Sequence, residues 1–186
     1  MTMEAIDIAG PEILKEWVGK SRVYEKSFNP ELMHEIQQFI FREARLQDIH
    51  DYDAWEDLWT DDGLYWVPAN GTDTDPERQM SLIYDNRSRI ALRIRQLKTG
   101  RRHSQTPPSQ LARVVSNFEL LKAGNDGDIH VMCTAQIFET NLRGDTMWAS
   151  RNEYTLRRVG GELKMAYKKV VLINNNKAIY TLSFLI

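Results

Sequence analysis

Residues 54–68 read AWEDLWTDDGLYWVP, and the boundary between a helical and a strand-rich part of the chain falls inside them. Trp55 and Trp59 lie at a spacing that places both indoles on one face of a helix. After Gly63 the run LYWVP is rich in aromatic and β-branched residues, which favour a strand, and Pro68 ends it. The stretch therefore predicts a short helix followed by the first strand of a sheet.

Acidic residues mark both ends of this short helix. We expect it to begin at Asp53, whose carboxylate would cap the backbone while Glu56 reaches back as in a capping box. The sequence Asp61-Asp62-Gly63 would end the helix in a turn. Acids and aromatic rings at this density suit either an active site or a well-packed corner.

The chain before this stretch contains one strongly amphipathic segment. In residues 31–47 apolar side chains recur at helical spacing, which predicts a helix with Phe39 and Ile40 on its buried stripe. The preceding sequence GPEILKEWVGKSRVYEK predicts a short helix in a separate arm. We therefore divide the chain into an N-terminal arm, residues 1–30, and a single domain, residues 31–186.

The segment 81–98 is expected to form one longer helix. Ile83, Ile90 and Ile94 recur at helical spacing. The outer face of this helix carries a group of basic side chains, namely Arg87, Arg89, Arg93, Arg95 and Lys98. A basic helix face in a net acidic protein is typical of a solvated or ion-pairing surface. The acidic run 48–62 is its natural complement, within the chain or between copies.

Beyond Leu111 the sequence alternates with period two. In DIHVMCTAQIF, residues 128–138, apolar side chains fall on one side and polar side chains on the other, as in a half-buried strand. Turn signals separate this run from further strands expected at about residues 113–122, 147–158, 163–173 and 179–186. Short hairpin connections imply antiparallel pairing. The sequence thus predicts an α+β fold whose mostly antiparallel sheet curls around the N-terminal helices.

Composition excludes several classes of function. The chain has 186 residues, a formal charge of -2 and one cysteine, Cys133. A single cysteine cannot form an internal disulfide, and a balanced surface gives no reason to expect nucleic-acid binding. No apolar run approaches the roughly 20 residues of a membrane helix, and the acidic N-terminus does not resemble a signal peptide. We expect a cytoplasmic protein that binds neither membrane nor nucleic acid.

The histidines do not form a recognisable metal-binding pattern. None of His34, His50, His103 and His130 pairs with another at the spacing that places two imidazoles on one ion. The nearest approach to a ligand cluster is His50 with the surrounding aspartates, Asp48, Asp51 and Asp53. An iron site there would need a second histidine brought in by folding. The plainer interpretation is that His50 is a solvated loop residue, and we predict no metal site.

Acid–base chemistry is possible because a curled sheet packed on helices forms a cone whose mouth can hold a carboxylate and a tyrosine. The candidates are Asp53, Asp57, Tyr65, Tyr154 and Tyr167. The alternative is that the aspartates are caps and turn residues while the tyrosines pack in strands. Nucleotide-binding and acyl-transfer motifs are not found in the sequence.

Three segments together resemble one family. QQFIFREARLQDIHDYDAWEDLWTDDGLYWVP, residues 37–68, resembles the opening of the small β subunits of bacterial aromatic ring-hydroxylating dioxygenases, whose pattern runs from FLxxEAxLLD to YxxWLxLxxDDxxYWxP. The residues in step are Glu43, Ala44, Asp48, Trp55, Asp61, Asp62, Tyr65, Trp66 and Pro68. TPPSQLARVVSNF, residues 106–118, is similar to the family's DPPSRxxRLVSN, and residues 149–175 are similar to its ending. The departures are Thr106, Gln110 and Asn174, which concern loop contacts.

The resemblance implies a cone of the NTF2-like, or cystatin-like, type. It also implies a large α subunit that carries a Rieske [2Fe-2S] centre and a mononuclear Fe(II), usually in an α3β3 hexamer supplied with electrons by a reductase and often a ferredoxin. The residues agree with this division of labour, because a Rieske cluster takes two cysteines and two histidines and this chain has one cysteine. We expect no cofactor, metal or catalytic residue in this chain, and the stretch at 54–68 to be a packed corner.

Three hypotheses of function follow. The first is a structural and assembly subunit of such an oxygenase, with Trp66, Arg101 and Arg102 as candidate interface residues because aromatic and arginine side chains are the usual interface anchors. The second is a stand-alone NTF2-like isomerase or dehydratase, which requires a roomy polar cavity in the cone. The third is a self-associating binding protein without chemistry.

Overall fold

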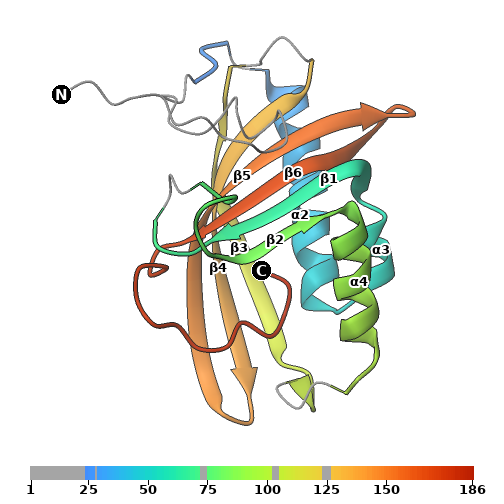
Figure 1. Cartoon of the computed structure of the whole chain (residues 1–186). Helices are drawn as coiled ribbons and strands as arrows, with labels where there is room; N and C mark the ends of the chain where they lie inside the picture. Colours follow the sequence, from blue (N-terminus) through green and yellow to red (C-terminus); the bar gives the residue numbers. More distant parts are fainter. Residues whose placement is uncertain (1–23, 28, 72–74, 102–104, 123–126) are drawn as a thin grey trace, which may run out of the picture.

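A curved sheet and its helices form the frame of the molecule (Figure 1). The computed structural model describes residues 24–27, 29–71, 75–101, 105–122 and 127–186. In these ranges the elements are α2 (Pro30–Asp48), α3 (Tyr52–Glu56), β1 (Trp59–Pro68), β2 (Ser81–Asn86), α4 (Arg87–Lys98), β3 (Gln110–Leu120), β4 (Ile129–Asn141), β5 (Gly144–Val159) and β6 (Glu162–Leu172). None of the helices in these ranges is long and apolar enough to cross a membrane.

The sheet has the strand order β2-β1-β6-β5-β4-β3. Every neighbouring pair is antiparallel except β1 and β6, which run parallel. The sheet remains open, so β2 and β3 are its edge strands. Figure 1 shows α2, α3 and α4 together on one side of the curved sheet. The predicted α+β fold, with a mostly antiparallel sheet curled around helices, is confirmed.

Helix α2 forms as its sequence predicts. Its N-cap is Asn29, whose side chain accepts a hydrogen bond from the backbone N–H of Leu32 at 3.1 Å. Ile36 and Ile40 are fully buried against the sheet, while Phe39 packs at the margin of the core. The buried stripe therefore positions α2 across the inner face of the sheet.

The short helix α3 begins earlier than predicted, and its cap is different. Asp51, not Asp53, accepts the backbone N–H of Ala54, at 3.2 Å. Residues 61–63 do not form the predicted terminating turn, because they lie within β1, where its pairing with β6 shifts register. Asp61 is exposed there and does not cap the helix. Pairing with β6 thus overrides the local turn signal of two aspartates and a glycine.

The predicted single helix over residues 81–98 is also wrong in its first part. Residues 81–86 form strand β2, which pairs with β1 so that Ile83 lies opposite Val67. Asn86 then caps α4, since its side chain accepts the backbone N–H of Arg89 at 3.1 Å. Ile83 is buried as a strand residue, so its helical spacing from Ile90 misled the prediction.

The C-terminal strand expected at residues 179–186 does not form. This segment is irregular, yet Ser183, Phe184, Leu185 and Ile186 are buried. Side chains rather than a neighbouring strand accept or donate the hydrogen bonds of this tail, as described below. The short helix predicted in the arm, residues 10–26, lies outside the described residues except for residues 24–26, which are not helical. The division at residue 30 stays a prediction.

Strand β1 separates two apolar clusters because its side chains alternate between the faces of the sheet. Tyr65 faces the helices and contacts Trp55 and Trp59, with ring centroids 5.9 Å apart in both pairs. Trp66 faces the other way, is fully buried, and shares a small cluster with Tyr167. The packed corner expected at residues 54–68 is present on the helix side.

A substitution at Gly63 tests the packing of this corner, because a Cβ atom at residue 63 would lie 2.8 Å from Cε3 of the buried Trp59 ring. We predict that Gly63→Ala lowers the free energy of unfolding by about 1–3 kcal/mol, the usual cost of overpacking a core. Urea unfolding followed by tryptophan fluorescence measures it. Thr140→Ala, on an exposed strand position, is the control and should change the value by less than about 0.5 kcal/mol. Equal effects of the two substitutions would contradict the packing described.

Candidate functional site

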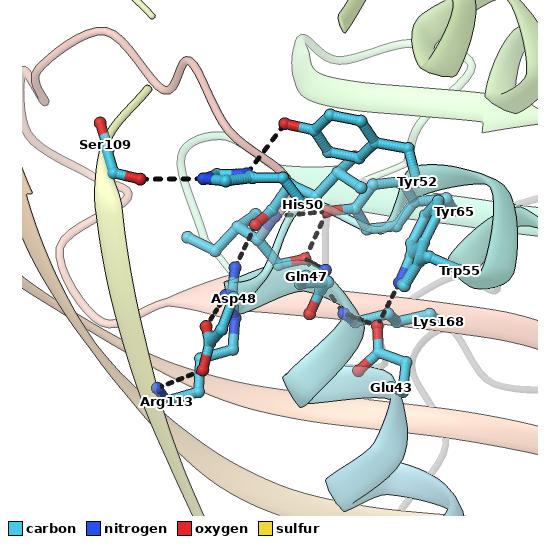
Figure 2. A network of polar contacts seen from close by, with 12 residues as sticks. Glu43, Gln47, Asp48, His50, Tyr52, Trp55, Tyr65, Ser109, Arg113 and Lys168 are labelled. Carbon is cyan, nitrogen blue, oxygen red and sulfur yellow. Dashed lines mark hydrogen bonds and ion pairs between the residues drawn. The ribbon is translucent and has the colours of Figure 1, made fainter. Parts of the chain in front are cut away.

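An ion pair lies inside the cone. The Nζ atom of Lys168, on β6, is 2.8 Å from Oε1 of Glu43, on α2, and both side chains are only 2% exposed. Transfer of two charges from water to such a site costs several kcal/mol for each ion, so the pair requires further polar partners to be tolerated. The surrounding residues supply them (Figure 2).

Glu43 receives two additional hydrogen bonds. The indole N–H of Trp55 donates to Oε1 at 2.7 Å, and the hydroxyl of Tyr154 donates to Oε2 at 3.4 Å. The ammonium group of Lys168 also lies over the rings of Tyr65 and Tyr154, at 5.6 and 5.7 Å from their centroids. The carboxylate and the ammonium group are therefore held from several elements at once.

The C-terminal tail closes this network. The main-chain oxygen of Ile186 accepts hydrogen bonds from the Tyr65 hydroxyl, from Lys168 at 3.1 Å and from the Gln47 amide at 3.4 Å. The N–H of Ile186 in turn donates to the Tyr65 oxygen at 3.1 Å. Further along the tail, Ser183 accepts a hydrogen bond from Gln105 at 2.8 Å. Tail residues thus lie against the buried ion pair and complete its hydrogen bonds.

Burial dominates the protonation of these groups. It raises the pKa of Tyr65 and of Tyr154 well above the ordinary value of a phenol. It lowers the pKa of Lys168, while the Glu43 carboxylate opposes that shift. The tyrosines are therefore neutral hydrogen-bond donors at physiological pH. The cluster contains acid–base groups, but each of them is bonded to the protein itself.

A second network joins α2 to β3. The side chain and the backbone N–H of Arg113 both donate to the Asp48 carboxylate, the latter at 2.9 Å, and the guanidinium group also donates to the carbonyl of Leu185. Beside it, His50 contacts the Ser109 carbonyl through Nε2 at 2.9 Å. The remaining nitrogen of the imidazole lies 2.9 Å from the hydroxyl of Tyr52.

These contacts correct the interpretation of His50 as a solvated residue, because it is half-buried with both ring nitrogens bonded. Asp51 caps α3 and Asp53 binds Lys98 at 2.5 Å, so neither shares an ion with His50. Among the described residues no cluster of three or more histidine, cysteine or acidic side chains could hold a metal ion.

The structure separates the five acid–base candidates. Tyr65 and Tyr154 meet at the buried ion pair, whereas Tyr167 faces the opposite side of the sheet. Asp53 and Asp57 are exposed on the outside of the molecule. The basic and acidic runs do complement one another within the chain, as Asp53 with Lys98 and Glu56 with Arg87 demonstrate.

The sequence interpretation did not assign Glu43 or Lys168 to a site, although Glu43 is among the residues in step with the family pattern. Glu43 falls on the apolar stripe of α2, and Lys168 interrupts the apolar run of β6. A charged residue at a position that the periodicity assigns to the core is a signal for a buried pair. The pairing of these two residues could not be inferred, because they are far apart in sequence.

The interface candidates lie in different surroundings. Trp66 is fully buried within the chain, and its indole donates to the Ser81 hydroxyl at 2.9 Å, so it is not the exposed anchor that was expected. Arg101 is exposed, and Arg102 lies outside the described residues. Their part in an interface stays a prediction.

The described residues leave a small cavity beside the buried groups. A cavity bordered by Tyr154, His130 and Tyr167 has a volume of about 10 Å³, which is room for no more than one water molecule. Glu43, Tyr65 and Lys168 are all nearly inaccessible to solvent. The arrangement suits a structural network rather than a substrate pocket, which counts against a stand-alone enzyme.

Comparison with known proteins gives the family. A family model described as the ring hydroxylating beta subunit matches residues 42–177, well over half of the chain. The chain belongs to this family. Among curated relatives, the toluate 1,2-dioxygenase subunit beta of Pseudomonas putida is 30% identical over 145 residues, which cover 75% of this chain and 89% of that protein. The biphenyl 2,3-dioxygenase subunit beta of Rhodococcus jostii is 28% identical, over 80% of this chain and 84% of that protein.

Solved structures agree with this ring-hydroxylating β subunit assignment. The β subunit of the benzoate 1,2-dioxygenase from Burkholderia mallei superposes with a TM-score of 0.65 at 26% identity, covering 81% of this chain and 95% of that one. An NTF2-like protein with a cystatin-like fold from Novosphingobium aromaticivorans superposes with a TM-score of 0.52 at 21% identity, over 77% of this chain and 83% of that one, which shows the fold alone. The predicted NTF2-like fold and the predicted family are both confirmed.

Substitutions in the Lys168–Glu43 ion pair test whether this buried network stabilises the fold. We predict that Lys168→Met lowers the free energy of unfolding by about 3–5 kcal/mol, because it leaves the Glu43 carboxylate buried without its cation. The double variant Glu43→Gln with Lys168→Met should lose clearly less, since no charge remains. Urea unfolding of the three proteins decides this. A cost below about 1 kcal/mol for the single variant would show that the pair is solvated.

The buried thiol gives a pH-dependent prediction. Burial raises the pKa of Cys133 from 9.0 to about 12, so the folded state keeps its proton more firmly than the unfolded state does. The stability due to this group is complete below about pH 9 and is lost as the pH rises toward 12. Between pH 8 and 10.5 the wild type should therefore lose about 2 kcal/mol more than Cys133→Val, measured by urea unfolding. Parallel losses in both proteins would contradict the burial of the thiol.

Proposed function

We propose that this protein is the β subunit of the terminal oxygenase component of an aromatic ring-hydroxylating dioxygenase, with a structural and assembly role. The match of the ring hydroxylating β subunit family over residues 42–177 carries the proposal. The two named curated relatives are β subunits of a toluate 1,2-dioxygenase and a biphenyl 2,3-dioxygenase. The buried groups of the cone are bonded to one another and to the tail, which supports a scaffold rather than a second active site.

The partner in this proposal is a large α subunit that carries the redox centres. A Rieske centre takes two cysteine and two histidine ligands, and this sequence contains one cysteine. The family resemblance implies that the mononuclear Fe(II) at which oxygen is activated also lies on the α subunit. We propose an α3β3 assembly in the cytoplasm that receives electrons from a reductase, directly or through a ferredoxin.

Arg101 and Arg102 are our candidate contacts for the assembly, together with Trp66. Arg101 is exposed beyond the end of α4, where a guanidinium group can form bidentate bonds with carboxylates of a partner. Trp66 would contribute indirectly, because it is buried beneath the outer face of β1.

Co-expression with the α subunit from the same organism tests the function. We expect a red-brown complex of about 200 kDa, estimated from a closed symmetric hexamer of this 21.7 kDa chain with a larger partner. Iron analysis and the visible spectrum should show a Rieske centre only in the complex. The Arg101→Glu, Arg102→Glu double variant should lower the yield of complex, whereas the control Arg95→Glu, on an exposed turn of α4, should not. A colourless, iron-free homo-oligomer under the same conditions would refute the proposal.

A further inference from the structure

The space between α2 and β3 is apart from the Lys168–Glu43 ion pair and adjoins the second network at Asp48 and Arg113. Two adjoining hollows with volumes of about 650 and 680 Å³ run between the helix and this edge strand. Phe41 and Val115 line both hollows, which therefore form one continuous groove. Met33 and Phe118 border one half, and Ile49 borders the other. We call this feature the α2/β3 groove.

The α2/β3 groove combines exposed apolar surface with positive charge. Phe41 is 42% exposed and Ile49 is 61% exposed, although Phe41 packs edge-on against Phe118 with ring centroids 5.6 Å apart. Arg42 and Arg45 are exposed on the same helix and form no ion pair with any residue in the described ranges.

The acid in the groove does not neutralise these arginines. Asp48 is its only acidic lining residue among those described, and its carboxylate is already bonded to Arg113. The second hollow contains three arginines and one aspartate, a formal excess of two positive charges. A complementary occupant therefore has carboxylates alternating with apolar side chains.

The N-terminal sequence has this composition. Residues 1–16, MTMEAIDIAGPEILKE, contain four acids and one lysine, interspersed with isoleucine, leucine and methionine. The arm enters the described structure at Tyr24, which pairs with Leu121 directly after β3, and the N–H of Glu25 donates to the carbonyl of Leu120 at 3.0 Å. The arm is thus attached beside one end of the groove.

The arm is also long enough to follow the groove. Helix α2 has 19 residues and so a length of roughly 28 Å. The 23 residues before Tyr24 would span about 34 Å even as one continuous helix, so the arm can reach along the whole of α2. Edge strands are commonly protected by a covering segment, and β3 has a neighbouring strand on one side only in the described sheet.

We propose that residues 1–16 bind in the α2/β3 groove of the same chain. Their carboxylates pair with Arg42 and Arg45, and their apolar side chains cover Phe41 and Ile49. The segment would shield the edge strand β3 and remove the apolar groove from the surface. This inference does not depend on the proposed function, since both partners belong to one chain.

Photo-crosslinking of the full chain tests this binding. The residue p-benzoylphenylalanine is placed at Ile8, the protein is irradiated, and cross-linked peptides are identified by mass spectrometry. We expect cross-links to residues 33–49 or 115–118 of the same chain. The double variant Arg42→Gln with Arg45→Gln should lower their yield about fivefold, a modest factor because exposed ion pairs are weak. The control Arg95→Gln, another exposed arginine without an ion pair in the described ranges, should leave the yield unchanged.

A mixture of isotopically light and heavy chains distinguishes cross-links within one chain from those between two copies. Cross-links only between copies, cross-links only to other surfaces, or no cross-links at all would each overturn the inference. An unchanged yield in the double arginine variant would overturn the role of charge, provided that its thermal unfolding matches that of the wild type.

Discussion

The Lys168–Glu43 ion pair is the interaction on which the interior depends. An unpaired ammonium group in this position would cost several kcal/mol, so Lys168 requires the carboxylate that α2 supplies. The pair in turn requires the indole of Trp55 and the backbone oxygen of Ile186 to complete its hydrogen bonds. One network thus holds α2, the sheet, α3 and the tail in a single arrangement. The network stabilises the fold much less if any member is removed.

This constraint explains why a cone with tyrosines, a carboxylate and a lysine is not an open active site. One scaffold can carry many functions, and function depends on which groups a ligand can reach. Here the hydroxyl of Tyr65 donates a hydrogen bond to Ile186, and the hydroxyl of Tyr154 donates one to Glu43. Burial raises the pKa of both phenols and so keeps them neutral. A domain of the ring-hydroxylating β subunit family whose buried ion pair is bonded to the protein itself suits a scaffold better than a second active site.

The sequence predicted much of this frame, because periodicity and turn residues are local signals. The helix over residues 31–47, the long strands and the corner at Trp55 and Trp59 follow from apolar spacing, and the family follows from ordered motifs. The remaining elements depend on contacts between residues far apart in sequence. Residues 81–86 form a strand rather than the predicted helix because they pair with β1. The tail is buried through hydrogen bonds to side chains and not as the predicted strand. Lys168 and Glu43 could not be matched for the same reason, although each stands out as a charge on an apolar face.

Hydrogen exchange of the Trp55 indole N–H, observed by NMR in the native protein, tests the sealed interior most directly. That proton is donated to Glu43 at 2.7 Å, beneath α3 and the tail. If the network is closed, its exchange requires opening with a free energy close to that of global unfolding. Trp148 of β5, whose buried indole donates to Glu139 at 2.9 Å, gives an internal reference away from the ion pair. Exchange of the Trp55 proton within seconds at neutral pH, with Trp148 still protected, would mean that solvent reaches the ion pair and would contradict the account.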